Sequence, residues 1–361
     1  MHLFCFGSSL VSAYWNGAAT YYRGLLKALA DRGHKISFAE PDAFERQAHR
    51  DIEDPNWADS IVFPAHPSGM DHALARAADA DVIVKFSGVG VLDEELEYAV
   101  LGLRAPGQTV IFWDVDAPAT LDRMGSAADD KLRKLIPRFD AVFTYGGGDA
   151  VVRAYRRFGA QLCVPIYNAL DPSTHHPVPA DPRFSADLAF LGNRLPDREA
   201  RVEEFFLKAA ALLPPCRFLL GGNGWADKKV PENVAYAGHV YTRDHNAFNV
   251  TPTAVLNVNR ESMARYGASP PTRIFEAAGA GACIISDAWA GIETFLEPEK
   301  EILVAEDGEA VAGHLASLQA EKAREIGVAA RRRVLAEHTY ALRAVLVENV
   351  LEGRAGLREA V

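Results

Sequence analysis

The sequence predicts an α/β protein built from two doubly wound domains, each a parallel sheet covered by helices. Short apolar runs alternate with amphipathic segments along the chain. The runs lack polar alternation, which is typical of strands buried on both faces of a parallel sheet. A proline-rich stretch then divides this pattern into two halves. The length of 361 residues fits two domains, at a prior of roughly 150 residues each.

The first half contains the more regular pattern. Its predicted strands lie at 2–6, 34–40, 81–86, 109–114, 140–145 and 162–166. A helix is predicted between the first two, because apolar side chains recur there at helical spacing. They are Tyr22, Leu25, Leu26 and Leu29. Gly33 is expected to end this helix in the left-handed conformation.

The pattern predicts four segments. Residues 1–172 form an N-terminal domain, 173–186 a stiff proline-rich linker, 187–338 a C-terminal domain, and 339–361 a helical tail that could cross back to the first domain. The second domain has predicted strands at 187–193, 216–222, 234–238, 253–259, 282–286 and 301–306. A helix is expected over roughly 197–212, and Asp307 should cap a later one.

Composition excludes several classes of function. The net charge of −10 disfavours a nucleic-acid binder, and no stretch approaches the ~18 apolar residues of a membrane span. The four cysteines lie in or beside apolar runs and form no C-x-x-C pair, so buried free thiols in a reducing, cytoplasmic compartment are expected. His175 and His176 lie in the linker without a third ligand, so we expect a solvated pair and no metal site.

The most informative segment is 269–291. Ser269 is predicted to cap a helix whose first turn contains Pro270 and Pro271. Arg273 and Glu276 then share a face near the helix start. In a functional interpretation, phosphates bind at this helix start beside Arg273, and Glu276 accepts hydrogen bonds from a ribose diol. The alternative is an intrahelical Arg–Glu pair without further function.

The run R-x-F-E-A-x-x-x-G-A at 273–282 resembles the donor-site motif of group 1 glycosyltransferases. It is most similar to the spore-maturation CgeB-like branch of the GT-B superfamily. Further similarities follow in the same order along the chain, at 112–118, 139–155, 187–198 and 254–260. The resemblance implies two Rossmann-like domains facing a central cleft. It also implies a nucleotide-diphosphate sugar bound mainly by the second domain, with the acceptor on the first.

The same resemblance and the chemistry of the leaving group indicate the donor-site residues. Negative charge develops on the departing diphosphate, so preorganised cations are needed. We predict Arg198 and Arg273 for this role, with close backbone approach at Gly192 and Asn193; Arg194, Arg201, Arg260 and Arg265 are weaker candidates. The resemblance implies that two further loops hold the nucleobase, through Gly222, Asn223, His239 and Val240.

Two sites in the first domain complete the prediction. Gly17 lies in a loop that the resemblance places near the diphosphate, although a plain strand-to-helix turn explains it as well. Asp114 and Asp116 follow a predicted strand, and either could act as a general base. Two alternatives stay open. D-x-D is also the metal motif of the unrelated GT-A glycosyltransferases, and Asp116 could cap the turn before Pro118.

The expected function is therefore a hexosyltransferase-like reaction. The donor is a UDP-, GDP- or dTDP-sugar, and the sequence names neither the nucleobase, the sugar, the acceptor nor the oligomeric state. Transfer is expected with retention, without a metal or other cofactor. Ala268 stands where many retaining members carry a second acidic residue, so the stereochemistry stays open. The alternatives are a nucleotide-sugar epimerase or hydrolase on the same fold, or a non-catalytic two-lobed sugar-binding protein.

Overall fold

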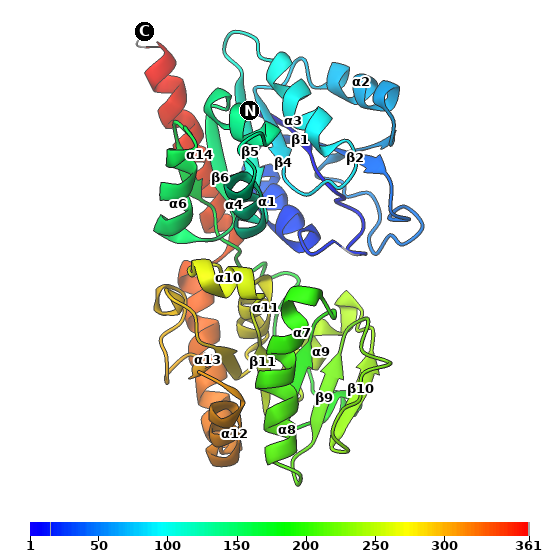
Figure 1. The fold of residues 1–361 in the computed structure, drawn as a ribbon, viewed down its shortest axis with the longest axis vertical. Coiled ribbons are helices and arrows are strands. Elements are labelled where there is room, and N and C mark those ends of the chain that lie inside the picture. Colours follow the sequence, from blue (N-terminus) through cyan, green and yellow to red (C-terminus); the bar gives the residue numbers. More distant parts are fainter. Residues whose placement is uncertain (15, 360–361) are drawn as a thin grey trace. The chain divides into compact units, whose positions relative to one another are not determined.

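The computed structural model describes residues 1–14 and 16–359, which divide into two compact units. The first unit comprises Met1–Tyr167 and the segment from Tyr340 onward, and the second comprises Asn168–Thr339. Each unit is a parallel sheet with helices on both faces (Figure 1). The predicted class, two doubly wound α/β domains, is confirmed.

The sheet of the first unit has the strand order β3-β2-β1-β4-β5-β6-β7, with every neighbouring pair parallel. Its strands are β1 (His2–Phe6), β2 (Lys35–Asp42), β3 (Asp59–Pro64), β4 (Val82–Phe86), β5 (Thr109–Asp114), β6 (Ala141–Thr144) and β7 (Cys163–Pro165). All residues of β4 and β6 are buried. The apolar runs are therefore strands covered on both faces, as their composition predicts.

The helices of the first unit connect these strands. They are α1 (Ala19–Asp31), α2 (Pro67–Arg76), α3 (Asp93–Gly102), α4 (Ala117–Ser126), α5 (Lys131–Leu135), α6 (Gly148–Arg157) and α14 (Tyr340–Glu359), with a 3₁₀ turn at Ile136–Arg138. The predicted apolar stripe of α1 is fully buried. Gly33 follows α1 with φ +92°, as expected for a left-handed helix end.

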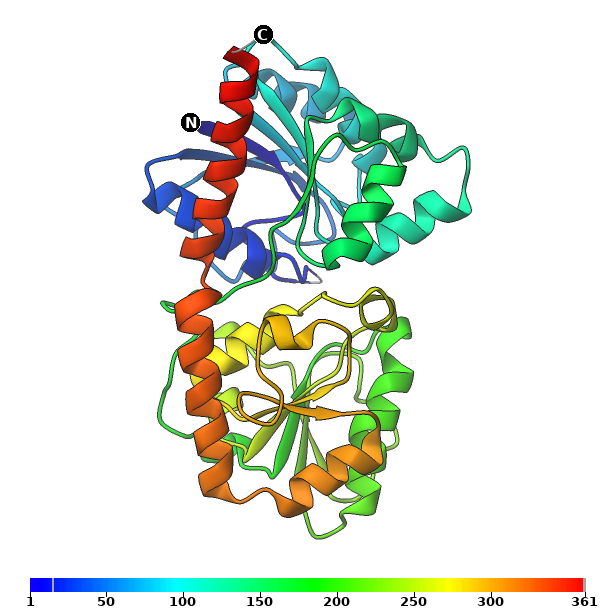
Figure 2. The same cartoon turned by 90° about the vertical axis from the view of Figure 1, so that its left-hand side faces the viewer.

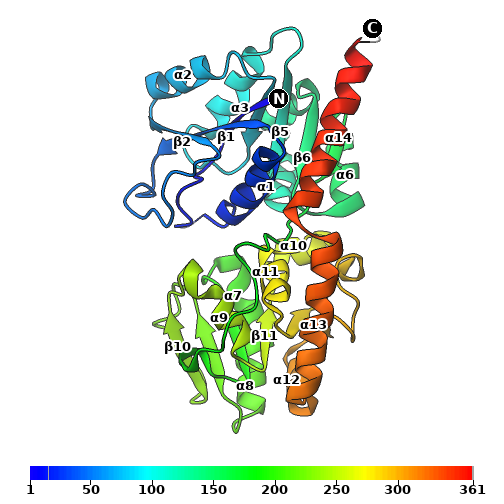
Figure 3. The same ribbon diagram turned by 180° about the vertical axis from the view of Figure 1, so that it is seen from behind.

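Helix α14 belongs to the first unit although it is the last element of the chain. It lies against α1, as Figures 2 and 3 show. The rings of Tyr21 and Tyr340 meet edge to face, 6.0 Å between centroids. Glu348 accepts hydrogen bonds from Arg32 and His34 at the far end of α1. These contacts join the end of the chain to its beginning within one unit.

The sheet of the second unit has the order β10-β9-β8-β11-β12-β13, again parallel throughout. Its strands are β8 (Leu188–Leu191), β9 (Phe218–Gly221), β10 (Val234–Gly238), β11 (Ala254–Asn257), β12 (Ile284–Asp287) and β13 (Leu303–Ala305). From β8 the chain adds β9 and β10 on one side of the sheet, and then returns to add β11, β12 and β13 on the other side. The switch point therefore lies between β8 and β11. Ligands of open α/β sheets bind outside the carboxyl ends of the strands at such a switch point.

The helices of the second unit are shorter on average. They are α7 (Pro196–Val202), α8 (Lys208–Leu212), α9 (His245–Val250), α10 (Glu261–Tyr266), α11 (Thr272–Ala280), α12 (Gly308–Ser317) and α13 (Ala320–Glu337). A π-helical segment, Glu203–Leu207, joins α7 to α8 within the helix predicted over 197–212. Asp307 caps α12 by accepting from the Ala310 N–H at 2.8 Å, as predicted. Among the described residues, no helix is both long and apolar enough to cross a membrane.

Two local expectations differ from the structure. Helix α11 begins at Thr272 after Pro271, and no side chain caps it; the Ser269 hydroxyl donates instead to the Gly267 carbonyl at 2.9 Å. Two consecutive prolines hold an extended backbone before the helix, which moves its start beyond the reach of Ser269.

The segment 173–186, expected as a linker, lies within the second unit. It packs against α11, where Gly279 has no side chain and so leaves room for the His175 carbonyl oxygen.

A buried ionic group lies beneath α3 in the first unit. The Lys85 ammonium is fully buried and donates to the Phe86 carbonyl and to Asp93 Oδ1, at 2.7 and 2.5 Å. Glu97 is 2% exposed, and Arg123 approaches it at 3.8 Å. Burial raises the pKa of Glu97 to about 7, opposed by the charge of Lys85. The folded protein therefore keeps this proton at pH values where the unfolded chain has lost it.

We expect this group to make stability fall as pH rises. Because the pKa of Glu97 is raised from 4.5 to about 7, its contribution is complete below pH 4.5 and is lost up to about pH 7. Glu97→Gln should therefore be more stable than the parent at pH 8, by about 2–3 kcal/mol. Denaturant unfolding at pH 5 and pH 8 measures the difference. Glu95→Gln, on the exposed side of the same helix, is the control; an equal response in both variants would contradict the assignment.

Candidate donor site at the carboxyl edge of the second sheet

Two guanidinium groups meet beside the first loop of the second unit. Arg198 lies on α7, where its Nη1 donates to the Asn193 carbonyl at 3.3 Å. Arg273 lies in the first turn of α11, with its guanidinium carbon 5.5 Å from the centre of the Phe190 ring. A methyl group at Gly192 would lie 3.2 Å from Arg198 Nη1 and 3.0 Å from the Phe190 ring. The small residue at 192 thus leaves the space that these side chains occupy.

Arg273 carries a charge that is not held in a contact ion pair within the described part of the chain. Within residues 1–14 and 16–359, its guanidinium makes no hydrogen bond or ion pair, and its contact is with the Phe190 ring. In particular, the ion pair with Glu276 that was the alternative interpretation is not formed. Burial and the nearby Arg198 charge lower the pKa of Arg273 to about 10. Two like charges held together at a helix start favour an anion between them.

Three of the four weaker candidate arginines are already paired with carboxylates. Arg194 bonds Glu199 and Asp227, Arg201 bonds Asp287, and Arg260 bonds Asp197. These pairs hold loops together and leave less charge for a ligand. The structure therefore distinguishes Arg273 from the weaker candidates, which the sequence alone could not rank.

The loops after β8 and β9 form one hydrogen-bonded unit. Gly222 has φ +115°, and a methyl group there would lie 2.2 Å from the Gly192 carbonyl oxygen. The Asn223 N–H donates to Asn193 Oδ1 at 3.0 Å, and the Trp225 indole donates to the Gly192 carbonyl at 2.7 Å. Four of the predicted donor-site residues, Gly192, Asn193, Gly222 and Asn223, therefore lie together. The Gly192 N–H is already used by the Gly221 carbonyl, at 3.0 Å.

The loop after β10 continues this arrangement. The Asn223 side chain lies 3.3 Å from His239 Nδ1, and the His239 ring meets the Tyr241 ring edge to face at 4.6 Å. Tyr241 is 57% exposed, and the Arg243 guanidinium carbon lies over its ring, 5.2 Å from the centroid. Val240 is buried, and its carbonyl lies 3.3 Å from His245 Nε2. The predicted nucleobase residues thus occupy adjoining loops at one edge of the sheet.

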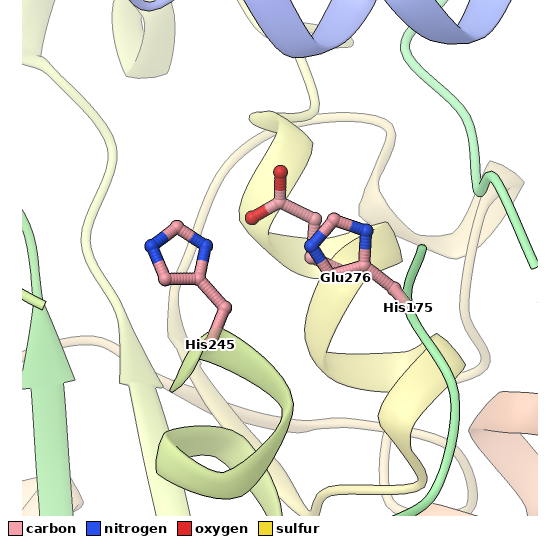
Figure 4. Close-up of side chains that lie close together, drawn as sticks. All are labelled: His175, His245 and Glu276. Carbon is pink, nitrogen blue, oxygen red and sulfur yellow. The ribbon is translucent and has the colours of Figure 1, made fainter. Parts of the chain in front are cut away.

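Glu276 lies one turn after Arg273 on α11, and two histidines face it (Figure 4). The possible ligand atoms of His175, His245 and Glu276 all lie within 4.8 Å of one another. His175 is 4% exposed, so the expectation of a solvated pair is wrong for this residue; His176 is exposed. No sequence pattern indicated the cluster, since its members lie on the segment before β8, on α9 and on α11.

Asp114 ends β5 in the first unit and is fully buried. Its carboxylate accepts from Ser87 Oγ at 2.7 Å, from the Asp116 N–H at 2.9 Å, from Thr120 Oγ1 and from the Tyr155 hydroxyl. Burial raises the pKa of Asp114, although the bond from Tyr155 opposes this shift. These four donors fix the β5–α4 loop and enclose both carboxylate oxygens.

Asp116 and Gly17 are the remaining predicted residues of the first unit. Asp116 stands before α4 and is half-buried, and its side chain does not cap that helix. The capping alternative is therefore not supported. Gly17 is exposed, has no positive φ, and a methyl group added there would meet nothing within 4 Å. Neither crowding nor backbone conformation requires glycine at this position.

Comparison with known proteins places this geometry in a wider context. Residues 198–349 match the family model described as "Glycosyl transferase-like". A sucrose-phosphate synthase from Thermosynechococcus elongatus superimposes with a TM-score of 0.70 at 16% identity, covering 99% of this chain and 100% of the other. The chain has the GT-B fold. The prediction of GT-B architecture is thereby confirmed, with a glycosyl transferase-like domain over its C-terminal part.

Two further structures are similar over nearly their whole length. The Anabaena protein Alr3699/HepE, in complex with UDP and glucose, gives a TM-score of 0.69 at 13% identity and covers 98% of this chain and 100% of its own. AviGT4, a glycosyltransferase involved in avilamycin A biosynthesis, gives 0.61 at 16% identity, covering 99% and 98%. No curated protein matches the sequence. The likeness of these GT-B structures to the chain lies in the fold.

Proposed function

We propose that the protein is a glycosyltransferase that transfers a sugar from a nucleotide-diphosphate sugar to a hydroxyl acceptor. The observation that carries this proposal is the half-buried guanidinium of Arg273, held near Arg198 and in no ion pair with a carboxylate of the described residues. When the bond between the anomeric carbon and the diphosphate breaks, its electron pair stays on the diphosphate oxygen. Preorganised cations stabilise that charge in the transition state. No resident metal is part of the proposal, since the guanidinium groups supply the positive charge.

The remaining donor contacts follow from the loops around Arg273. In the proposal, Glu276 accepts hydrogen bonds from the ribose hydroxyls. The exposed side chain of Tyr241 and the polar groups of Asn223 and His239 surround the nucleobase. A UDP-sugar is our first choice of donor, because HepE, which has a similar fold, forms a complex with UDP and glucose. The ordered motifs from 112 to 282 support a place in the CgeB-like branch.

The proposed general base lies in the first unit, and the residue that bears on the stereochemistry lies in the loop before α11. Asp116 is the proposed general base, because Asp114 already accepts from four donors. We propose retention of configuration on the resemblance of segment 273–282. Ala268 brings no carboxylate and has φ +39°, with its N–H bonded to the Ala290 carbonyl. A contact to the sugar hydroxyls therefore has to come from other residues.

A reducing, cytoplasmic location completes the proposal. The described cysteines are free, and Cys5, Cys163 and Cys283 are buried. Burial raises the pKa of Cys163 and of Cys283 to about 12, so both stay as unreactive thiols at neutral pH.

The role of Glu276 is tested with two nucleotides. UDP and its 2′-deoxy analogue differ by one ribose hydroxyl, which the proposal pairs with this carboxylate. Glu276→Gln should weaken UDP binding by about tenfold, since a hydrogen bond to a charged group contributes about 1.5–3 kcal/mol. It should weaken the deoxy analogue much less. Calorimetry measures both affinities, and Glu321→Gln on α13 is the control. An equal loss of affinity for the two nucleotides would show that Glu276 does not bind the ribose 2′-hydroxyl.

A further inference from the structure

The cluster around Glu276 has the chemistry of a transition-metal site. Two imidazoles and one carboxylate converge within 4.8 Å of one another, and these are groups that bind zinc and similar ions. They come from three separate segments of the second unit. Figure 4 shows one nitrogen of each ring facing the Glu276 carboxylate.

Hydrogen bonds fix the tautomer of His175. The Thr174 hydroxyl donates its single proton to the Asp171 carbonyl at 3.2 Å, so its oxygen accepts from His175 Nδ1–H at 3.0 Å. The other ring nitrogen, Nε2, then carries a lone pair. That atom is buried and has no hydrogen-bond partner among the described residues. A buried, unpartnered lone pair aimed at a carboxylate is costly unless a ligand occupies the space between them.

His245 is held in the complementary way. Its Nε2 lies 3.3 Å from the Val240 carbonyl and donates to it, which leaves the lone pair on Nδ1. This is the nitrogen that faces Glu276. Metal-binding histidines typically donate their second ring nitrogen to a carbonyl or carboxylate in this manner.

The two histidine segments are also fixed to each other. Asn246 Nδ2 donates to the Thr174 carbonyl at 2.9 Å, and Asn246 Oδ1 accepts from the His176 N–H at 3.3 Å. This amide joins the start of α9 to the backbone on both sides of His175. The ligand groups are therefore positioned before an ion arrives.

We propose that His175, His245 and Glu276 bind a divalent transition-metal ion such as Zn²⁺, and that the ion competes with the nucleotide ribose for Glu276. The second clause rests on the proposed function, in which Glu276 holds the ribose. The ion is inhibitory in this scheme and takes no part in transfer. A carboxylate shared between the ion and the donor would make glycosyl transfer sensitive to free zinc.

Zinc chloride titrated calorimetrically into the full, metal-stripped chain tests the site without nucleotide. We expect one ion per chain, and affinity lowered at least about tenfold in His175→Ala and in His245→Ala. His176→Ala, an exposed neighbour, should bind as the parent does. If His175→Ala does not fold because its side chain is buried, His245→Ala still tests the site. No binding by the parent, or binding by both variants equal to that of the parent, would overturn the site.

A second titration tests the competition. UDP present at saturation should lower the apparent zinc affinity in proportion to its concentration, whereas simultaneous binding of both would overturn the shared use of Glu276. If UDP does not bind even without zinc, the proposed function fails, and the competition with it. The titration with zinc alone still decides the metal site. Cobalt(II) in place of zinc gives an independent readout, because its absorption reports the number of ligands.

Discussion

Arg273→Ala is expected to lower the rate of glycosyl transfer by about 10²–10³, the usual loss when one donor to a developing oxyanion is removed. The reason is that this guanidinium is half-buried near Arg198 and forms no ion pair with a carboxylate of the described residues. Steady-state kinetics with a UDP-sugar, together with calorimetry on UDP, measure the loss. Arg273→Lys keeps the charge but not the planar pair of donors, so its rate should lie between those of the parent and the alanine variant.

The same alanine variant should not lose stability. Burial and the Arg198 charge lower the pKa of Arg273 to about 10, which means that its charged form is disfavoured in the unliganded protein. Removing it is expected to raise the free energy of unfolding by about 1–2 kcal/mol, after allowance for lost packing on Phe190. Arg183→Ala, at an exposed pair with Asp181, is the control and should change neither quantity. A destabilised Arg273→Ala with normal kinetics would make the residue structural.

Gly222→Ala is expected to have the second large effect. A methyl group at this position would lie 2.2 Å from the Gly192 carbonyl oxygen, on a backbone with φ +115°. The two loops that carry Gly192, Asn193 and Asn223 must then separate. We expect a loss of about 2–4 kcal/mol in stability from strain and overpacking. Nucleotide affinity should fall by about 10²-fold, because a shift near 1 Å is enough to misplace the contacts.

A second glycine variant separates the effect of the steric clash at Gly222 from the cost of placing alanine in a left-handed backbone conformation. Gly33 has φ +92°, but a methyl group there would meet nothing within 4 Å. Gly33→Ala should therefore lose only about 1–2 kcal/mol, the cost of the left-handed conformation for alanine, and should bind nucleotide normally. Thermal unfolding and UDP calorimetry on both variants provide the comparison. If Gly222→Ala binds UDP as the parent does, the loop unit is not part of the donor site.

Most of the element order was readable from the sequence because it depends on local pattern. The exception is the edge strand β3 (Asp59–Pro64), which was not predicted; only two of its residues are buried, so it lacks the continuous apolar run of the other strands. Apolar runs such as 81–86 and 109–114 became buried parallel strands, and the apolar stripe of α1 is buried as its spacing predicts. The second sheet was equally predictable, from 187–193 onward. In these segments burial on both faces and helical periodicity leave one arrangement that satisfies the backbone and removes the apolar side chains from water.

Contacts between segments distant in sequence were not predictable. Ser269 looked like a helix cap, but the prolines that follow it delay the helix to Thr272. His175 looked like a loop residue, yet it is buried against α11 beside Glu276. Asp114 looked like a candidate base, but it accepts from four donors, two of which, Ser87 and Tyr155, are distant in sequence. Which polar atoms meet is decided by tertiary packing, for which a single sequence carries no periodic signal.

The return of α14 to the first unit constrains how the chain can be made. The second unit is continuous from Asn168 to Thr339, whereas the first needs a helix that is synthesised after all of it. Domains fold as units while they emerge from the ribosome. The second unit can therefore acquire its structure while the surface of α1 that α14 covers is still open to solvent.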